Sequence, residues 1–167
     1  MRFLGIDPGL RITGYGCVDG DAPGGLDAAL VEAGVFRLTA ERQGERVPVA
    51  DRLFELHHDL TELLDRLRPE AVAVEAVFSH YKHPATAIAM GHARGVILLA
   101  IRTAGHRLIE LKPNEIKKYL TGNGHAGKEQ MQGAVQGRLR LAAPPEPPDV
   151  ADAIAMALCA ASRVALV

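Results

Sequence analysis

The feature that most constrains the fold is a change in the spacing of apolar residues along the chain. Up to about residue 40 they form short runs separated by turn residues, as in β-strands. Three strands are therefore expected: Arg2–Asp7, Thr13–Val18 and Ala33–Thr39. Leucines then recur at helical spacing from Leu53 to Leu67, which predicts an amphipathic helix between Pro48 and Pro69. Because the strands have short connections, they should pair antiparallel.

Strands and helices alternate in the rest of the chain. Residues Ala71–Glu75 form an apolar run that ends in a carboxylate, as expected of a buried parallel strand. The remaining expected elements are a helix from Pro84 to about Ala104, a strand at Arg107–Leu111, and helices at Pro113–Leu120, Lys128–Leu139 and Asp149–Val164. This order predicts a single α/β domain over residues 1–167. Its mixed sheet should be antiparallel in the first three strands and parallel afterwards, with helices on both faces.

Charge is sorted along the chain, although the net charge is only −1. Residues 1–75 hold 8 Lys/Arg and 14 Asp/Glu, a balance of −6, whereas residues 76–128 hold 8 Lys/Arg and 2 Asp/Glu, a balance of +6. All five lysines fall in the second block. Scatter over a solvated face is one interpretation; a single basic surface that faces a polyanion is the favoured one.

Other features restrict the compartment. The two cysteines, Cys17 and Cys159, have no CxxC spacing, so neither a zinc site nor a disulfide framework is expected. No secretion signal precedes the first strand. The most apolar stretch, Ala85–Ala104, contains basic residues and is a poor candidate for a membrane span. We expect a cytoplasmic protein without a membrane partner.

Four carboxylates stand where chemistry is usually found in such a fold. Asp7 and Glu75 end two strands, while Asp149 and Asp152 share a face at the start of the last helix. In an open α/β sheet, sites lie beyond the carboxyl ends of the strands. Clustered carboxylates repel one another unless cations neutralise them. Mg²⁺ or Mn²⁺ suits all-oxygen ligands, and two such ions about 4 Å apart can assist phosphodiester hydrolysis.

Each of these acids also has a simpler interpretation. Asp7, before Pro8 and Gly9, is typical of a turn, and Asp149 is typical of a helix N-cap. Glu75 is harder to explain in this way, because an acid at the end of a buried strand is costly without a partner. Taken together, the residues favour a metal-dependent catalytic cluster.

Four segments, in order along the chain, resemble the crossover junction endodeoxyribonuclease RuvC family. They are LGIDPGLRITGYG (Leu4–Gly16), AVAVEAVF (Ala71–Phe78), GHARGV (Gly91–Val96) and DVADAIAMA (Asp149–Ala157). The resemblance implies a ribonuclease H-like fold, a homodimer and the resolution of Holliday junctions by paired symmetric nicks in DNA recombination and repair. It also implies divalent metal, for which the clustered carboxylates suggest two ions per site, and a branch-migration complex of the RuvA and RuvB type as partner.

The resemblance assigns roles to residues as well. It implies that the four carboxylates Asp7, Glu75, Asp149 and Asp152 bind metal and act in catalysis. Lys117 and Lys128 are implied to lie near the scissile phosphate, and Lys128 is counted with the catalytic residues. Phe78 is implied to stack on junction bases.

The basic block supplies further candidate DNA contacts. Aromatic residues make up only 4% of the chain, yet Phe78 and Tyr81 lie three apart in a polar loop that also holds Lys82. A base stacked on an aromatic ring gains about 1–3 kcal/mol whatever its identity. Phe78 could equally cover the edge of the core. Lys118, beside Lys117, is expected to face phosphates.

Two other functions fit parts of the sequence. The early Gly-Ile-Asp-x-Gly turn also resembles actin-like ATPases and sugar kinases, but these need a second, similar domain, for which 167 residues leave no room. A non-catalytic module that binds branched DNA is the other alternative. The carboxylates argue against it, because a pure binder gains nothing by placing acids near phosphates.

The helix expected over Ala85–Ala104 bears on the oligomeric state. It is apolar on most sides, and Ala87, Gly91 and Gly95 recur every four residues, a spacing that permits close helix contact. A central core helix of a monomer would show the same pattern. The family resemblance favours a homodimer interface.

Overall fold

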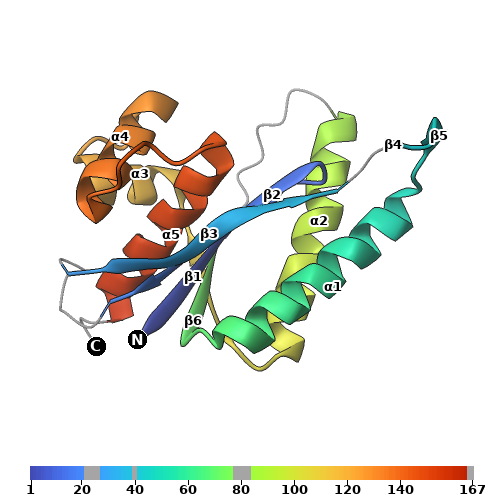
Figure 1. The fold of residues 1–167 in the computed structure, drawn as a ribbon, viewed down its shortest axis with the longest axis horizontal. Helices are drawn as coiled ribbons and strands as arrows, with labels where there is room; N and C mark the ends of the chain where they lie inside the picture. The colour runs from blue at the N-terminus through green and yellow to red at the C-terminus, as the bar shows by residue number, and fades with distance from the viewer. Residues whose placement is uncertain (21–26, 39–40, 77–83, 165–167) are drawn as a thin grey trace.

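A computed structural model describes residues 1–20, 27–38, 41–76 and 84–164 (Figure 1). The elements are β1 (Arg2–Asp7), β2 (Ile12–Asp19), β3 (Ala29–Arg37), β4 (Glu41–Arg42), β5 (Glu45–Arg46), α1 (Val49–Leu67), β6 (Ala71–Glu75), α2 (Pro84–Thr103), β7 (Arg107–Leu111), α3 (Pro113–Thr121), α4 (Lys128–Leu139) and α5 (Pro148–Val164). The expected helices are all present.

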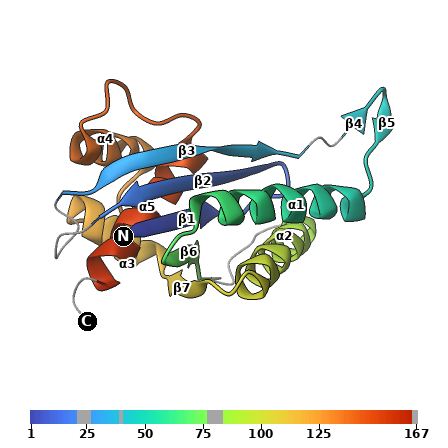
Figure 2. The same cartoon turned by 60° about the horizontal axis from the view of Figure 1, so that its bottom comes forward.

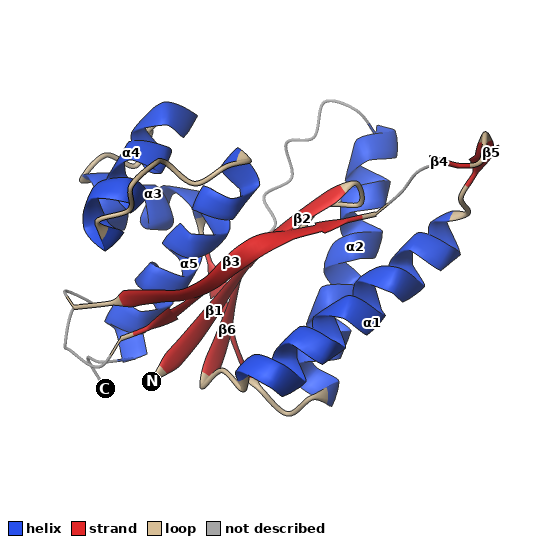
Figure 3. Ribbon diagram, viewed as in Figure 1, coloured by secondary structure: helices blue, strands red, loops and turns tan. Residues whose placement is uncertain are grey.

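Five strands form a mixed sheet in the order β3-β2-β1-β6-β7 (Figures 2 and 3). The β1–β2 and β2–β3 pairs are antiparallel, whereas β1–β6 and β6–β7 are parallel. The predicted division of the sheet into an antiparallel and a parallel part is therefore confirmed. β1 lies at the centre, where its buried alternating side chains contribute to both faces.

Helices cover both faces of the sheet, as predicted (Figures 1 and 2). α1 and α2 pack on one face, where the leucines of α1 meet Leu4 and Ile6 of β1. α5 packs on the other face, together with α3 and α4, and its core there includes Phe3 of β1. Since side chains alternate along a strand, Asp7 lies on the same face as Phe3, toward α5.

Glycines let α5 lie directly on the sheet. A Cβ atom added to Gly5 would stand 1.9 Å from the carbonyl oxygen of Ala153. One added to Gly16 would stand 2.5 Å from Cγ1 of Ile154. No side chain fits in these places, so the backbone of α5 packs against the backbones of β1 and β2.

The first three strands differ from the sequence prediction in detail. β3 spans Ala29–Arg37, not Ala33–Thr39, and begins four residues earlier. It is an edge strand whose side chains are mostly half-buried, so apolar alternation marks its start poorly. The β2–β3 register also shifts between Cys17 and Val18.

A small hairpin, β4–β5, was not predicted. Its strands have two residues each, all charged, and so lack the apolar alternation on which strand prediction depends. The turn consists of Gln43 and Gly44, whose φ angles of 53° and 81° are typical of a tight hairpin.

α2 is buried on one side only. Its length and composition would allow it to cross a membrane, but core helices of soluble proteins have the same properties. Of its most apolar 18-residue stretch, 22% is buried. Ile88 and Leu99 are 60% and 61% exposed. Gly91 and Gly95 face open space. Within the single chain α2 is therefore not the central core helix that the sequence pattern also allowed.

Candidate active site

The sheet brings Asp7 and Glu75 together at the carboxyl ends of two neighbouring strands, β1 and β6. β1 and β6 are parallel, and their last registered pair is Ile6 with Val74. Asp7 and Glu75 are the next residue of each strand, so both emerge at the carboxyl ends of neighbouring strands. In β6, Ala71 and Ala73 belong to the core under α5, which places Glu75 on the same face as Asp7.

The start of α5 contributes Asp149 and Asp152. Asp149 lies in the first turn of the helix, just above the sheet. Asp7 pairs with Gly14 across the β1–β2 ladder, and a Cβ on Gly14 would stand 2.2 Å from the carbonyl oxygen of Asp149. The missing side chain at position 14 thus allows the N-terminal turn of α5 to approach the end of β1.

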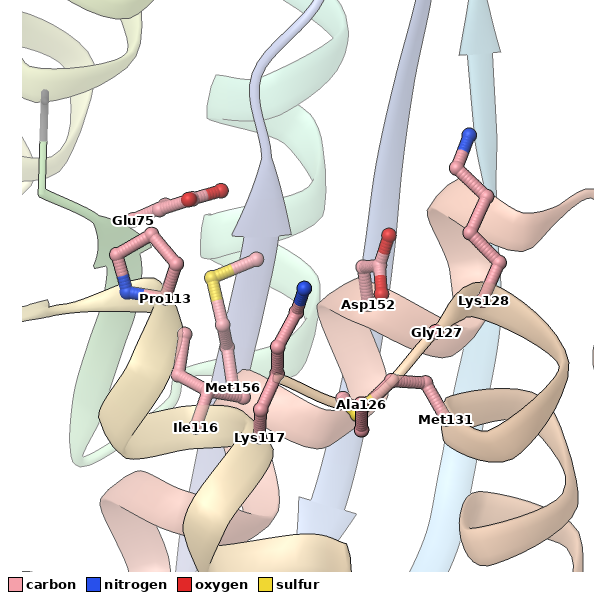
Figure 4. Close-up of a pocket in the computed structure, with 10 residues that line it drawn as sticks. All are labelled: Glu75, Pro113, Ile116, Lys117, Ala126, Gly127, Lys128, Met131, Asp152 and Met156. Carbon is pink, nitrogen blue, oxygen red and sulfur yellow. The ribbon is translucent and has the colours of Figure 1, made fainter. Parts of the chain in front are cut away.

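A cavity of about 200 Å³ opens beside these acids (Figure 4). Glu75 of β6 and Asp152 of α5 line it from different sides. Lys117 of α3 and Lys128, the first residue of α4, complete its charged lining, and in Figure 4 the Lys117 ammonium group lies between the two carboxylates. The remaining lining is mostly apolar, for example Met156.

Burial and neighbouring charges raise the pKa values of three of these acids. Burial, followed by the charges of Asp152, Glu75 and Asp149, raises the pKa of Asp7 to about 8, against a smaller opposing effect of Lys128. Burial and the Asp152 charge raise the pKa of Glu75. Burial also raises the pKa of Asp152, and the lysines at positions 117 and 128 oppose this shift. Burial is the largest cause of each shift, and neighbouring carboxylates add to it, so a bound cation would favour the ionised forms of these acids.

These properties suit hard divalent cations. The donors are carboxylate oxygens, which Mg²⁺ and Mn²⁺ prefer, and a cation would offset both the burial and the repulsion that raise the three pKa values. Among the residues that the structure describes, no three His, Cys, Asp or Glu side chains are already grouped to hold an ion.

Arg94 of α2 was not predicted as a site residue, yet it fixes the end of β6. Its Nη1 donates a hydrogen bond to the carbonyl oxygen of Glu75 at 2.7 Å. Its Nη2 pairs with Glu110 of β7. The Arg94 charge also offsets part of the rise in the pKa of Glu75. Its place in the GHARGV segment was the available signal, but sequence cannot show that a side chain of the following helix reaches back to the end of this strand.

The other predicted site residues fall in two groups. Lys118 is exposed on α3 and does not line the cavity that Lys117 and Lys128 border. Phe78, Tyr81 and Lys82 lie outside the described residues.

Similarity to known proteins covers nearly the whole chain. The profile of the family described as crossover junction endodeoxyribonuclease RuvC matches residues 3–160. The protein of that name from Rhodopirellula baltica is 46% identical over 157 residues, 94% of this chain and 84% of the relative. The one from Moorella thermoacetica is 43% identical over 166 residues, 97% of this chain and 92% of the relative.

Solved structures agree with this. Thermus thermophilus RuvC in complex with Holliday junction substrate matches with a TM-score of 0.86 at 37% identity, over 99% of this chain and 96% of that one. The yeast mitochondrial Holliday junction resolvase Ydc2 matches with a TM-score of 0.69, over 98% of this chain and 81% of that one. At 14% identity it supports the fold alone. The ribonuclease H-like mixed sheet expected from the sequence is confirmed.

Proposed function

The chain belongs to the RuvC family of crossover junction endodeoxyribonucleases, and from this we infer that it is a Holliday junction resolvase, an endonuclease that hydrolyses phosphodiester bonds in four-way junction DNA. The observation that carries the proposal is the set of half-buried acids with raised pKa values at the carboxyl ends of β1 and β6 and the start of α5, bordered by two lysines. An acidic site with adjacent cations suits a phosphodiester and metal ions together. Neither the actin-like ATPase nor the non-catalytic module is favoured by these similarities.

We propose that Asp7, Glu75, Asp149 and Asp152 hold divalent cations, Mg²⁺ or Mn²⁺, with two ions per site. When bound, such ions activate water and stabilise the charge on the phosphate that is cut. Asp7 must lose its proton to act as a ligand, since the pKa of its carboxyl is about 8 without metal. Metal binding should therefore release protons near neutral pH.

The lysines would hold the phosphate. Lys128 borders the same cavity as Asp152, so its ammonium group can contact a phosphate oxygen beside the acids. Lys117, between Glu75 and Asp152 in Figure 4, would do the same from α3. We assign Lys128 to catalysis and Lys117 to DNA binding near the cut.

Four further residues complete the proposed DNA contacts. Lys118 is exposed next to Lys117 and can reach phosphates farther from the cut. Phe78, Tyr81 and Lys82 follow Glu75 in the sequence, and we propose that the two rings stack on bases where strands exchange.

We propose a homodimer with α2 at its interface. Ile88 and Leu99 are exposed large apolar residues on this helix, and the open space beside Gly91 and Gly95 permits close approach of a second helix. A two-fold dimer presents the same site twice, which matches a junction that needs two symmetric nicks. The dimer would work in the cytoplasm beside a branch-migration complex of the RuvA and RuvB type.

A mixed-subunit experiment tests paired nicking. Wild-type chains are mixed with Asp7→Asn chains, and a junction extruded in a supercoiled plasmid is followed on gels. Wild-type dimers should give linear plasmid, and mixed dimers mainly nicked circles. Asp65→Asn, a change at an exposed position on α1, is the control and should behave as wild type. If wild-type protein yields singly nicked plasmid and no linear plasmid, the proposal is refuted.

A further inference from the structure

A second cavity, of about 530 Å³, lies next to the candidate active site. Asp149 lines it, so the cavity and the proposed metal ligands share the start of α5. Its other walls come from the turn after β1, including Arg11, from Arg52 of α1, and from the first turns of α2, including Met90. The cavity thus lies between the start of α5 on one face of the sheet and α1 and α2 on the other, at the end of the sheet where cleavage is proposed.

Arg52 is an unusual residue to find in this wall. It is 8% exposed, and the described residues give its guanidinium one hydrogen bond, from Nη2 to the carbonyl oxygen of Leu10. Its Nε has no hydrogen-bond partner, and no Asp or Glu among the described residues forms an ion pair with it. A guanidinium has five N–H donors and is always charged. A buried positive charge without a counterion is unfavourable unless a ligand supplies one.

The rest of the lining indicates which anion fits. Arg11 is exposed and adds a second positive charge, against the single negative charge of Asp149. Leu10, Ile12 and Met90 make part of the wall apolar. A phosphate alone would leave most of 530 Å³ empty, whereas a phosphate with its attached deoxyribose would occupy both the charged and the apolar parts.

We propose that this cavity binds a second backbone phosphate of the cleaved DNA strand, next to the scissile one, with Arg52 as its fixed cation and Arg11 at its opening. The proposal rests on the proposed function, because it takes the strand in the neighbouring site to be junction DNA. Arg52 would then set the register of the strand, so that only one phosphate can lie over the acids.

A purely structural role for Arg52 makes a different prediction. Its bond to Leu10 helps to hold the turn after β1, and Thr13 holds the same turn from inside, where its Oγ1 accepts from the Gly9 N–H at 3.1 Å and donates to the Gly9 carbonyl oxygen. Thr13 does not line the cavity. If Arg52 only fixes the turn, Arg52→Gln and Thr13→Val should have the same effects.

Junction affinity is measured against salt concentration in EDTA, which prevents cleavage. Arg52→Gln and Arg11→Gln should each lower the log–log slope by about one unit, because each loses one phosphate contact. Thr13→Val, and Arg107→Gln on the exposed side of β7, should keep the wild-type slope. Arg52→Lys retains a charge without the planar fork, so it should keep the slope but bind more weakly.

Single neutral methylphosphonates along the cleaved strand then locate the contact. For wild-type protein, a methylphosphonate next to the cut should weaken junction binding about ten-fold. For Arg52→Gln, the same methylphosphonate should cause no further loss of affinity. A wild-type slope in Arg52→Gln and Arg11→Gln, or the same methylphosphonate loss with and without Arg52, overturns the subsite. If Arg52→Gln does not fold, the slopes and affinities of Arg11→Gln and Arg52→Lys still show whether the cavity binds a phosphate. Cleavage of unmodified junctions by wild type tests the proposed function separately.

Discussion

Replacing Asp7 by Asn should stabilise the metal-free protein, although it removes a residue of the proposed active site. The pKa of the Asp7 carboxyl is about 8 in the folded protein, against 3.8 as its ordinary value. Between these pH values the folded chain holds a proton that the unfolded chain has lost. Stability from this group is complete below pH 3.8 and is lost as the pH rises toward 8.

The size of the effect follows from the shift. Each pH unit within this range costs the wild type about 1.4 kcal/mol, so two units cost at most about 2.7 kcal/mol. Asn does not titrate, so it avoids both the burial of a charge and the repulsion from Asp152, Glu75 and Asp149 that raise the pKa of Asp7. We therefore expect the stability of Asp7→Asn relative to wild type to increase by about 1–3 kcal/mol between pH 5 and pH 7. This corresponds to roughly 3–10 °C in Tm for a chain of this length.

Thermal unfolding followed by circular dichroism in EDTA, at pH 5, 6 and 7, measures this difference. Asp65→Asn is the matched control, since it removes a carboxylate from an exposed site on α1 and should track wild type. Millimolar Mg²⁺ should reverse the order, because ligand binding stabilises the wild type more. If Asp7→Asn is no more stable than wild type at any of these pH values in EDTA, Asp7 has a favourable partner and the proposed cluster of repelling acids is wrong.

Three further changes test other parts of the site. Gly14→Ala should reduce cleavage at least ten-fold, because the added Cβ would stand 2.2 Å from the Asp149 carbonyl oxygen and displace the start of α5. Junction cleavage under single-turnover conditions measures this effect, and full activity would contradict the close packing of α5 on β2. Gly133→Ala, in α4 with open space around it, should instead stabilise the protein by about 0.5–1 kcal/mol in urea unfolding, and a loss of stability would show an unseen contact. Arg94→Lys should lower kcat about ten-fold at unchanged junction affinity, since one ammonium group cannot replace the fork that holds Glu75, and excess Mn²⁺ should restore part of it; weaker DNA binding instead would mark Arg94 as a DNA contact.

Much of the fold was predictable because local patterns and tertiary packing agree. The leucines of α1 lie at helical spacing and are buried, and β6 is a continuous apolar strand that is covered on both faces. The end of that strand marked Glu75 as a site residue, because a carboxylate after a buried run needs a reason. The direction of the strand, given by its pairing with β1, then placed Asp7 beside it.

Two of the parts that were missed depend on contacts between distant segments, and the third is a local hairpin without apolar residues. Arg94 reaches the backbone of Glu75 from a helix whose sequence pattern shows only apolar spacing. Arg52 has the sequence surroundings of an ordinary helix surface residue, yet it is buried against the turn after β1. The hairpin β4–β5 is entirely charged and leaves no apolar signal. In each case the decisive partner is more than ten residues away or provides only backbone atoms.

The contact between α5 and the glycines of β1 and β2 has a consequence for how precisely the site can be held. Two of the four proposed ligands belong to the sheet and two to the helix, and the bodies that carry them meet through main-chain atoms. Side chains change rotamer on fast timescales, whereas packed main chain does not. Heating should therefore change the distances between the four proposed ligands little until α5 separates from the sheet. Activity should persist almost to the unfolding temperature and then disappear within the same narrow transition, with no inactive folded intermediate.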